Sequence, residues 1–197
     1  MSKNLVLCCD GTANEFAEDR TNVVKLFFTL VRDPAAQVAY YHPGLGTMEP
    51  PGTLTQTTRI ATRLAGQAFG YGLEADIRDV YIFLMNNFAE GDRVFLFGFS
   101  RGAYTARAVA SLLRMYGLIS KGNDALVPYA IRMLMAIHAI DSEGGGRSVE
   151  EKRYFTLAAD FKGTFSADLQ ALVCRCVGYC ELGRLVRKST AIALYGR

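Results

Sequence analysis

Short apolar runs alternate along this chain with segments whose apolar residues recur every three or four positions. The apolar run at 5–9 ends at the polar tripeptide Asp10-Gly11-Thr12, and the runs at 37–41 and 93–97 have a similar length and character. Uninterrupted apolar runs of this length are typical of strands that are buried on both faces of a parallel sheet. The pattern therefore predicts three buried strands.

Helical segments separate and follow these strands. The spacing and composition predict helices over six ranges: 23–31, 59–69, 73–88, 103–116, 124–140 and 148–161. Asn22 is predicted to cap the first helix, and Gly117 to end the helix over 103–116. Strands that alternate with helices predict an α/β fold, with a doubly wound, mainly parallel sheet that helices cover on both sides.

The composition excludes several broad classes of protein. Half of the 197 residues are apolar and 21% are charged, which excludes disordered and coiled-coil proteins. The formal net charge of +3 is small and follows no basic stripe, so nucleic acid is not an expected partner. Five cysteines without CxxC spacing favour reduced thiols, and the sequence predicts neither a metal site nor another cofactor.

The sequence lacks the pattern of a membrane anchor or of an export signal. Its longest apolar stretch, 103–119, contains Arg107 and Arg114, whereas a transmembrane helix needs about 20 nearly uncharged residues. The first ten residues have no long apolar region and no cleavage site of a signal peptide. We therefore expect a buried helix at 103–119 and a cytoplasmic protein.

The most informative motif is a Gly-x-Ser-x-Gly sequence between a strand and a helix. Gly98, Ser100 and Gly102 supply its fixed positions. A serine on a sharp strand-to-helix turn has a strained backbone and an exposed hydroxyl, and small flanking residues avoid collisions with neighbouring backbone. The motif in this context predicts that Ser100 is a catalytic nucleophile. The alternative is an ordinary turn in which Ser100 only caps the helix.

A nucleophilic serine needs backbone N–H groups that stabilise the oxyanion of the intermediate. The N–H of Arg101 begins the helix, so it is one expected donor. The turn of Asp10, Gly11 and Thr12 after the first strand is expected to supply the other and to contact substrate, with Gly11 as donor. Asp10 either holds this loop by accepting N–H bonds or only shapes an ordinary turn.

Asp-Gly-Thr also occurs in phosphatases with an aspartyl nucleophile. Those enzymes need a second carboxylate two residues away, and Cys8 and Thr12 occupy these positions here. That class is excluded by residue type.

The two histidines are weaker candidates for catalysis. His42 precedes a Pro-Gly turn, where it either packs against the turn or at the surface, or lines the pocket. His138 lies in an apolar helical run and is expected to belong to the core. Among the arginines of the long helix, Arg101 is near enough to the motif to meet an anionic substrate head group, whereas Arg107 and Arg114 are expected to be solvated or paired with carboxylates.

Four separated motifs together resemble one family of hydrolases. They are CDGTAN at 9–14, TNV at 21–23, YYHPGLGT at 40–47 and GFSRGAYTAR at 98–107. In this order they resemble the DUF2235 family, which includes the Tle1-type phospholipase effectors of type VI secretion. The resemblance covers residues 3–166. It implies an α/β-hydrolase fold, a Ser-Asp-His triad with Ser100 as nucleophile, and hydrolysis of esters or phospholipids.

The chain departs from this family in its later part. The acid and the histidine of the family lie in later motifs that are not readable in this sequence. We therefore predict that 1–166 is the N-terminal part of a truncated α/β-hydrolase domain. Residues 167–197 form a tail unlike the family, with no clear strand or helix period. They are predicted to be translated out of frame, because the codons of 175–180, read one nucleotide later, can spell Gly-Val-Trp-Asp-Thr-Val.

The sequence thus predicts a serine hydrolase of acyl esters, with a lipid or small ester as substrate. Peripheral contact with a membrane and export as a type VI effector are compatible with this function. Two alternatives remain open. The chain is either a catalytically incomplete product, or a non-catalytic binding module of the same fold.

Overall fold

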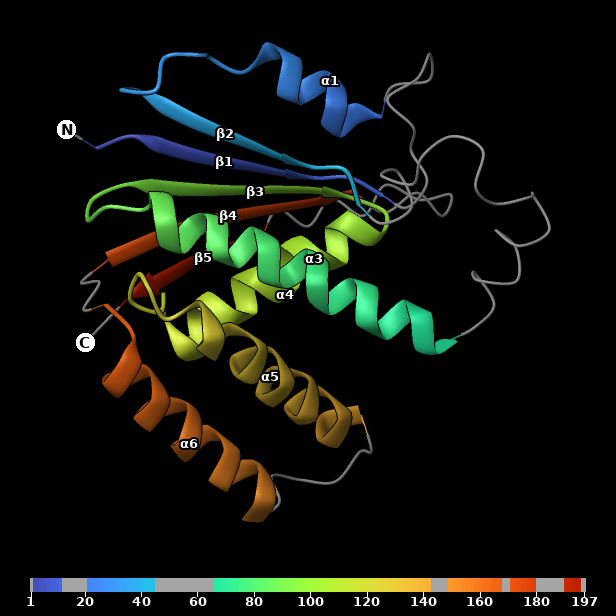
Figure 1. Cartoon of the computed structure of the whole chain (residues 1–197), viewed down its shortest axis with the longest axis vertical. Coiled ribbons are helices and arrows are strands. Elements are labelled where there is room, and N and C mark those ends of the chain that lie inside the picture. Colours follow the sequence, from blue (N-terminus) through green and yellow to red (C-terminus); the bar gives the residue numbers. More distant parts are fainter. Residues whose placement is uncertain are drawn as a thin grey trace.

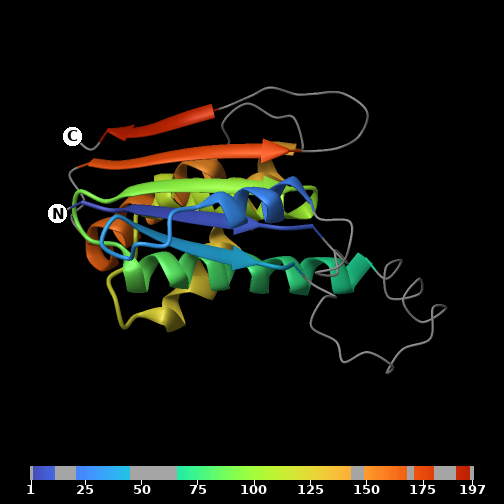
Figure 2. The same ribbon diagram turned by 90° about the horizontal axis from the view of Figure 1, so that it is seen from above.

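A five-stranded sheet forms the centre of the computed structural model, which describes residues 2–11, 21–44, 66–142, 149–167, 171–179 and 190–195 (Figure 1). Its strands are β1 (Asn4–Cys9), β2 (Gln37–His42), β3 (Arg93–Phe99), β4 (Ala171–Tyr179) and β5 (Thr190–Tyr195). Their spatial order is β2-β1-β3-β4-β5, which Figure 2 shows from above. The first four strands of this order are parallel, and β5 is an antiparallel edge strand. The predicted mainly parallel sheet is therefore confirmed.

Helices pack on both faces of the sheet. They are α1 (Asn22–Thr29), α3 (Gly66–Asn87), α4 (Arg101–Tyr116), α5 (Val127–Ser142) and α6 (Val149–Phe165), with a short 3-10 turn at Asp124–Leu126. Leu5 and Leu7 of β1 belong to a large core with α3, α4, α5 and α6, whereas Val6 and Cys8 belong to a smaller core with α1. Alternate residues of a strand point to opposite faces, so the buried run of β1 serves both layers, and the fold is doubly wound as predicted.

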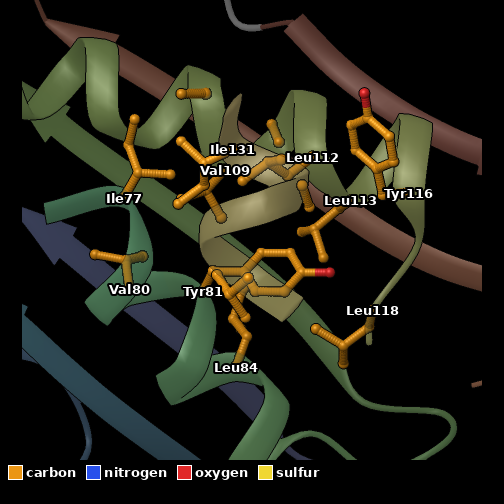
Figure 3. Close-up of a cluster of buried hydrophobic side chains, with 14 of the residues drawn as sticks. Ile77, Val80, Tyr81, Leu84, Val109, Leu112, Leu113, Tyr116, Leu118 and Ile131 are labelled. Atoms are coloured by element: carbon orange, nitrogen blue, oxygen red, sulfur yellow. The ribbon is translucent and has the colours of Figure 1, made fainter. Parts of the chain in front are cut away.

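The large core fixes α4, the helix that follows the Gly-x-Ser-x-Gly motif. Figure 3 shows apolar side chains of α3 meeting those of α4 and α5, among them Ile77, Tyr81, Val109, Leu112 and Ile131. Each fully buried side chain of this size contributes about 1.5–3 kcal/mol by its removal from water. The start of α4 is consequently held by the packing of its whole buried face. The prediction of a buried helix, rather than a membrane anchor, is confirmed for 103–116.

The predicted cap of α1 and the predicted break within α3 are wrong. The N-cap of α1 is Thr21, whose hydroxyl oxygen accepts a hydrogen bond from the N–H of Val24 at 3.2 Å, whereas Asn22 is already helical. α3 begins at Gly66 and continues through Gly70 and Gly72, where the sequence predicted a break. A glycine weakens a helix by about 1 kcal/mol but still donates its N–H, so a well-packed helix continues through it. Residues 59–65 lie outside the described part of the chain. Gly117 ends α4 as predicted, with φ 70°.

The segment 167–197 contains two strands, which the sequence did not predict. β4 pairs with β3 from Arg93–Val173 to Phe99–Tyr179, and β5 then pairs with β4. The apolar run of β4 is broken by Arg175, so its own pattern is weak. An open edge of β3 offers unpaired N–H and C=O groups, and a strand that pairs there satisfies them. Pairing with β3, rather than local pattern, accounts for this strand.

Candidate active site

Ser100 stands at the turn between β3 and α4 in a strained backbone conformation. Its φ of 52° and ψ of −120° make it the one non-glycine residue with positive φ in the described part of the chain. A non-glycine residue in such a region costs about 1–3 kcal/mol, and this strain concentrates at functional sites. The side chain is exposed, and in this part of the chain it makes no capping hydrogen bond to α4. This strained turn, called the elbow below, has the backbone expected where a strand leads through Gly-x-Ser-x-Gly into a helix, and it differs from a capping serine, whose backbone is extended.

The two glycines of the motif let the elbow pack against backbone. A Cβ atom on Gly98 would lie 2.3 Å from the carbonyl oxygen of Gly102, and one on Gly102 would lie 2.1 Å from that of Cys9. Both distances are shorter than any real contact of such atoms, so only glycine fits. The close approach of Gly102 places the end of β1, and with it Asp10, directly beside the elbow.

Asp10 anchors the loop that follows β1. Its side chain is buried, and its carboxylate accepts hydrogen bonds from the N–H of Gly11 at 2.8 Å, the hydroxyl of Thr21 at 2.7 Å and the hydroxyl of Tyr41 at 2.8 Å. Burial, then the hydrogen bond to Asp10, raises the pKa of Tyr41 well above its ordinary value. The carboxylate thus joins β1, β2 and the start of α1. The N–H of Gly11 is engaged by Asp10, and Thr12 lies outside the described residues.

His42 packs against the turn that follows β2, and the hydrogen bond of its ring is made within that turn. Nδ1 accepts a hydrogen bond from the N–H of Gly44 at 3.2 Å, so the proton of the neutral ring is on Nε2. Nε2 lies 3.9 Å from a carboxylate oxygen of Asp76. With Nδ1 occupied and the proton on Nε2, the neutral ring has no free lone pair to take the proton of a serine hydroxyl. The side chain of His138 lies outside the described residues.

Asp76 is a buried carboxylate that the sequence analysis did not single out. It belongs to α3, and its second oxygen lies 3.5 Å from Nε of Arg101, the residue after Ser100. Burial raises the pKa of Asp76, and the neighbouring His42 and Arg101 side chains oppose this rise. The signal in the sequence is an aspartate directly before Ile77, on the apolar face of a predicted helix. That signal alone does not identify a partner.

The arginines of α4 fall into two groups. The side chain of Arg101 is 8% exposed and turned toward Asp76 rather than toward solvent. Arg107 and Arg114 are exposed, as predicted.

A cavity of about 690 Å³ lies away from these residues, between α5 and α6, and is lined by Tyr129, Arg132, Met133, Ala136, Arg153, Tyr154 and Leu157.

The described residues carry no cluster of metal ligands and no helix suited to crossing a membrane. In the ranges that the structure covers, three or more His, Cys, Asp or Glu side chains are nowhere grouped as a metal site would require. Of the helices in these ranges, none is both long and apolar enough to span a bilayer.

Burial, then the charge of Asp10, raises the pKa of Cys8 to about 12, which keeps this thiol protonated.

Comparison with known proteins gives a family match over most of the chain. The family model of the catalytic domain of Tle1-like type VI secretion phospholipase effectors matches residues 3–178. An uncharacterized protein of Saccharomyces cerevisiae, YEL023C, is 35% identical over 178 residues, which are 87% of this chain and 25% of the yeast protein. The chain thus spans about a quarter of the length of this curated relative. No solved structure is significantly similar to the chain.

Proposed function

Since the chain belongs to the family of Tle1-like phospholipase effectors of type VI secretion, we propose that it is a serine hydrolase of phospholipid acyl esters with Ser100 as nucleophile. The observation that carries the proposal is the positive φ of Ser100 between β3 and α4. A glycine at position 100 would adopt this φ without strain, so the strain follows from the serine side chain. A hydroxyl presented above the end of a parallel sheet is in the place where such folds bind substrates.

The reaction that fits this site is acyl transfer in two steps. Oγ of Ser100 attacks the ester carbonyl carbon while its proton passes to a general base. The carbonyl oxygen becomes an oxyanion, which accepts a hydrogen bond from the N–H of Arg101 at the positive end of α4. The alcohol leaves with a proton, and an acyl-serine remains. Water then attacks this ester, and the fatty acid and the free hydroxyl of Ser100 are released.

The general base lies outside the described side chains in this proposal. Nδ1 of His42 accepts a hydrogen bond from the N–H of Gly44, and Nε2 carries the proton of the neutral ring and lies 3.9 Å from Asp76. This observation favours a second candidate function, in which the chain keeps the elbow and binds a lipid or ester without turning it over. Contact with a membrane surface and export as an effector belong to the first candidate and follow from the family alone.

Covalent labelling tests the nucleophile. A fluorophosphonate probe should phosphonylate the wild-type chain at Ser100 and leave Ser100→Ala unlabelled, because only an activated serine displaces fluoride from phosphorus. Mass spectrometry of the labelled peptide identifies the site. Equal labelling of the two proteins, or labelling at another serine, contradicts the proposal.

Turnover separates the two candidate functions. Hydrolysis of p-nitrophenyl esters and of phospholipid vesicles is measured for the wild type against Ser100→Ala. In hydrolases of this kind, loss of the nucleophile costs about 10⁶-fold in turnover. Hydrolysis well above the Ser100→Ala control supports the enzyme. Hydrolysis no faster than that of the Ser100→Ala control supports the chain that binds but does not turn over.

A further inference from the structure

Three titratable side chains from three different elements meet beside the elbow. Asp76 of α3 lies 3.5 Å from Arg101 at the start of α4 and 3.9 Å from His42 at the end of β2. The side chains of Asp76, Arg101 and His42 are 4%, 8% and 12% exposed. We call this group the Asp76 cluster. None of its side chains has a role in the two-step reaction described above.

Stability alone is a poor reason for such a cluster. Removing a carboxylate and a guanidinium from water costs more than their attraction commonly returns, and a well-packed apolar pair at the same place is often more stable. A buried charge pair is best explained by the geometry it imposes. Here the charges are placed where α3, α4 and β2 come together, and each partner of Asp76 is directly attached to a loop of the candidate site.

The first partner connects Asp76 to the elbow. The Arg101 residue contributes its side chain to Asp76 and its backbone N–H to the proposed oxyanion hole. It also follows Ser100 directly in the chain. A fixed Arg101 side chain therefore restricts the first turn of α4 and the direction of its N–H. Asp76 itself is held in place by α3, because the neighbouring Ile77 is fully buried in the core.

The second partner connects Asp76 to the loops after β1 and β2. Nδ1 of His42 accepts a hydrogen bond from the N–H of Gly44. Gly44, at φ +73°, packs so closely on the loop after β1 that a Cβ atom would lie 2.8 Å from the carbonyl oxygen of Gly11 and 2.9 Å from that of Asp10. A shift of the His42 ring is thus transmitted to the backbone at Asp10 and Gly11, and the carbonyl of Asp10 in turn lies against Gly102 of the elbow.

We propose that Asp76 is a positioning residue. By interacting with both Arg101 and His42, it sets the distance between the elbow at Ser100 and the Asp10–Gly11 loop that the reaction of Ser100 requires. This inference rests on the proposed function of Ser100. Asp76 contacts neither substrate nor the reacting atoms, so its effect is on the rate of attack by Ser100 rather than on binding.

The test measures how fast Ser100 reacts once the probe is bound. Labelling by a fluorophosphonate at several concentrations gives a maximal rate and a half-saturating concentration. Asp76→Asn keeps the shape and removes the charge, and we expect the maximal rate to fall on the order of tenfold or more, because small misplacements of reacting groups are costly. The half-saturating concentration should change less than about twofold. Asp79→Asn is the control, since Asp79 is on the same helix, half exposed and paired with Arg78 at 3.6 Å.

A double variant separates positioning through Arg101 from a general loss of structure. If Asp76 acts by holding Arg101, then Asp76→Asn combined with Arg101→Gln should react no more slowly than the slower single variant. Arg101→Gln also replaces Asp76→Asn if circular dichroism shows that the latter does not fold. In that variant Asp76 can take up a proton in place of its lost partner, and the same fall in maximal rate is expected.

The outcomes separate this inference from the proposed function. A wild type that is not labelled at Ser100 overturns the function itself. A labelled wild type with an unchanged maximal rate in a folded Asp76→Asn, or in Arg101→Gln when only that variant folds, overturns the positioning role. So do multiplicative losses in the double variant, or an equal loss in Asp79→Asn.

Discussion

At the scale of single residues, the site is defined by where the chain accepts strain and where it excludes side chains. Ser100 has a φ of 52°, which most non-glycine residues avoid. Gly102 excludes a side chain because the carbonyl of Cys9 would lie 2.1 Å from its Cβ atom. Both features place the hydroxyl of Ser100 at the end of β1, and both should be measurable as free energies of unfolding.

The strain at Ser100 predicts an unusual order of stability. Ser100→Gly should be more stable than Ser100→Ala by about 1–2 kcal/mol, because alanine keeps the Cβ atom that disfavours positive φ. The control is Gly163→Ala in α6, where a new Cβ atom meets nothing within 4 Å. There alanine should be the more stable residue by about 0.5–1 kcal/mol, as in any open helical position. Urea unfolding measures both differences. An alanine variant of Ser100 as stable as the glycine variant would show that the turn is unstrained.

At the scale of elements, the position of α4 depends on one tyrosine that connects α3 to the loop after α4. The hydroxyl of Tyr81 donates a hydrogen bond to the carbonyl of Gly117 at 2.6 Å and accepts one from the N–H of Ile119 at 3.1 Å. Tyr81 is fully buried, so both backbone groups depend on it for a partner. This connection fixes the end of the helix that begins at the elbow.

Tyr81→Phe should therefore destabilise the protein, by about 1–3 kcal/mol, since it leaves two buried backbone groups without a partner. Tyr116→Phe is a matched control, because Tyr116 is equally buried but its hydroxyl has no hydrogen-bond partner in the described part of the chain. That substitution should change stability by less than about 0.5 kcal/mol, as it removes no hydrogen bond. Thermal and urea unfolding compare the two. Equal losses would mean that the volume of the ring, and not the hydrogen bonds, accounts for the effect.

At the scale of the whole molecule, the sheet brings the end of β4 close to the elbow. Gly98 pairs with Gly178 and Phe99 pairs with Tyr179, so the C-terminal end of β4 lies at the same edge of the sheet as the turn at Ser100. The family match also runs to residue 178, past the boundary at 166 that the sequence analysis gave to the hydrolase domain. This edge is where a parallel α/β sheet carries its polar site residues.

The out-of-frame origin of 167–197 remains a prediction, and the sheet gives it a physical consequence. In the shifted frame, the codons of 175–180 can spell Gly-Val-Trp-Asp-Thr-Val, which would place the aspartate at position 178, opposite Gly98 of β3. A carboxylate there would stand beside the elbow, where a catalytic acid is needed. Sequencing the gene through codons 167–197 decides the matter. Codons that give no tryptophan-aspartate pair over 177–179 in the other frame would exclude the frameshift.

The sequence by itself determined the local features of this protein. The strands β1 and β3, the partly buried edge strand β2, the helix over 103–116 and the turn at Ser100 all depend on neighbours within a few positions of the chain. Apolar runs, helical spacing and the positions of glycines are local patterns, so they predict such features directly. For that reason the strand–serine–helix context was readable without any tertiary information.

Only the tertiary structure decided which distant groups meet. The Asp76 cluster joins positions 42, 76 and 101, and nothing in the spacing of these residues indicates that His42 and Arg101 share one carboxylate. The N–H of Gly11 is engaged by Asp10, and β4 forms because β3 offers it an edge. Charge pairing, hydrogen-bond competition and strand pairing act between elements, so their outcome depends on how the elements pack rather than on the order of residues within any one of them.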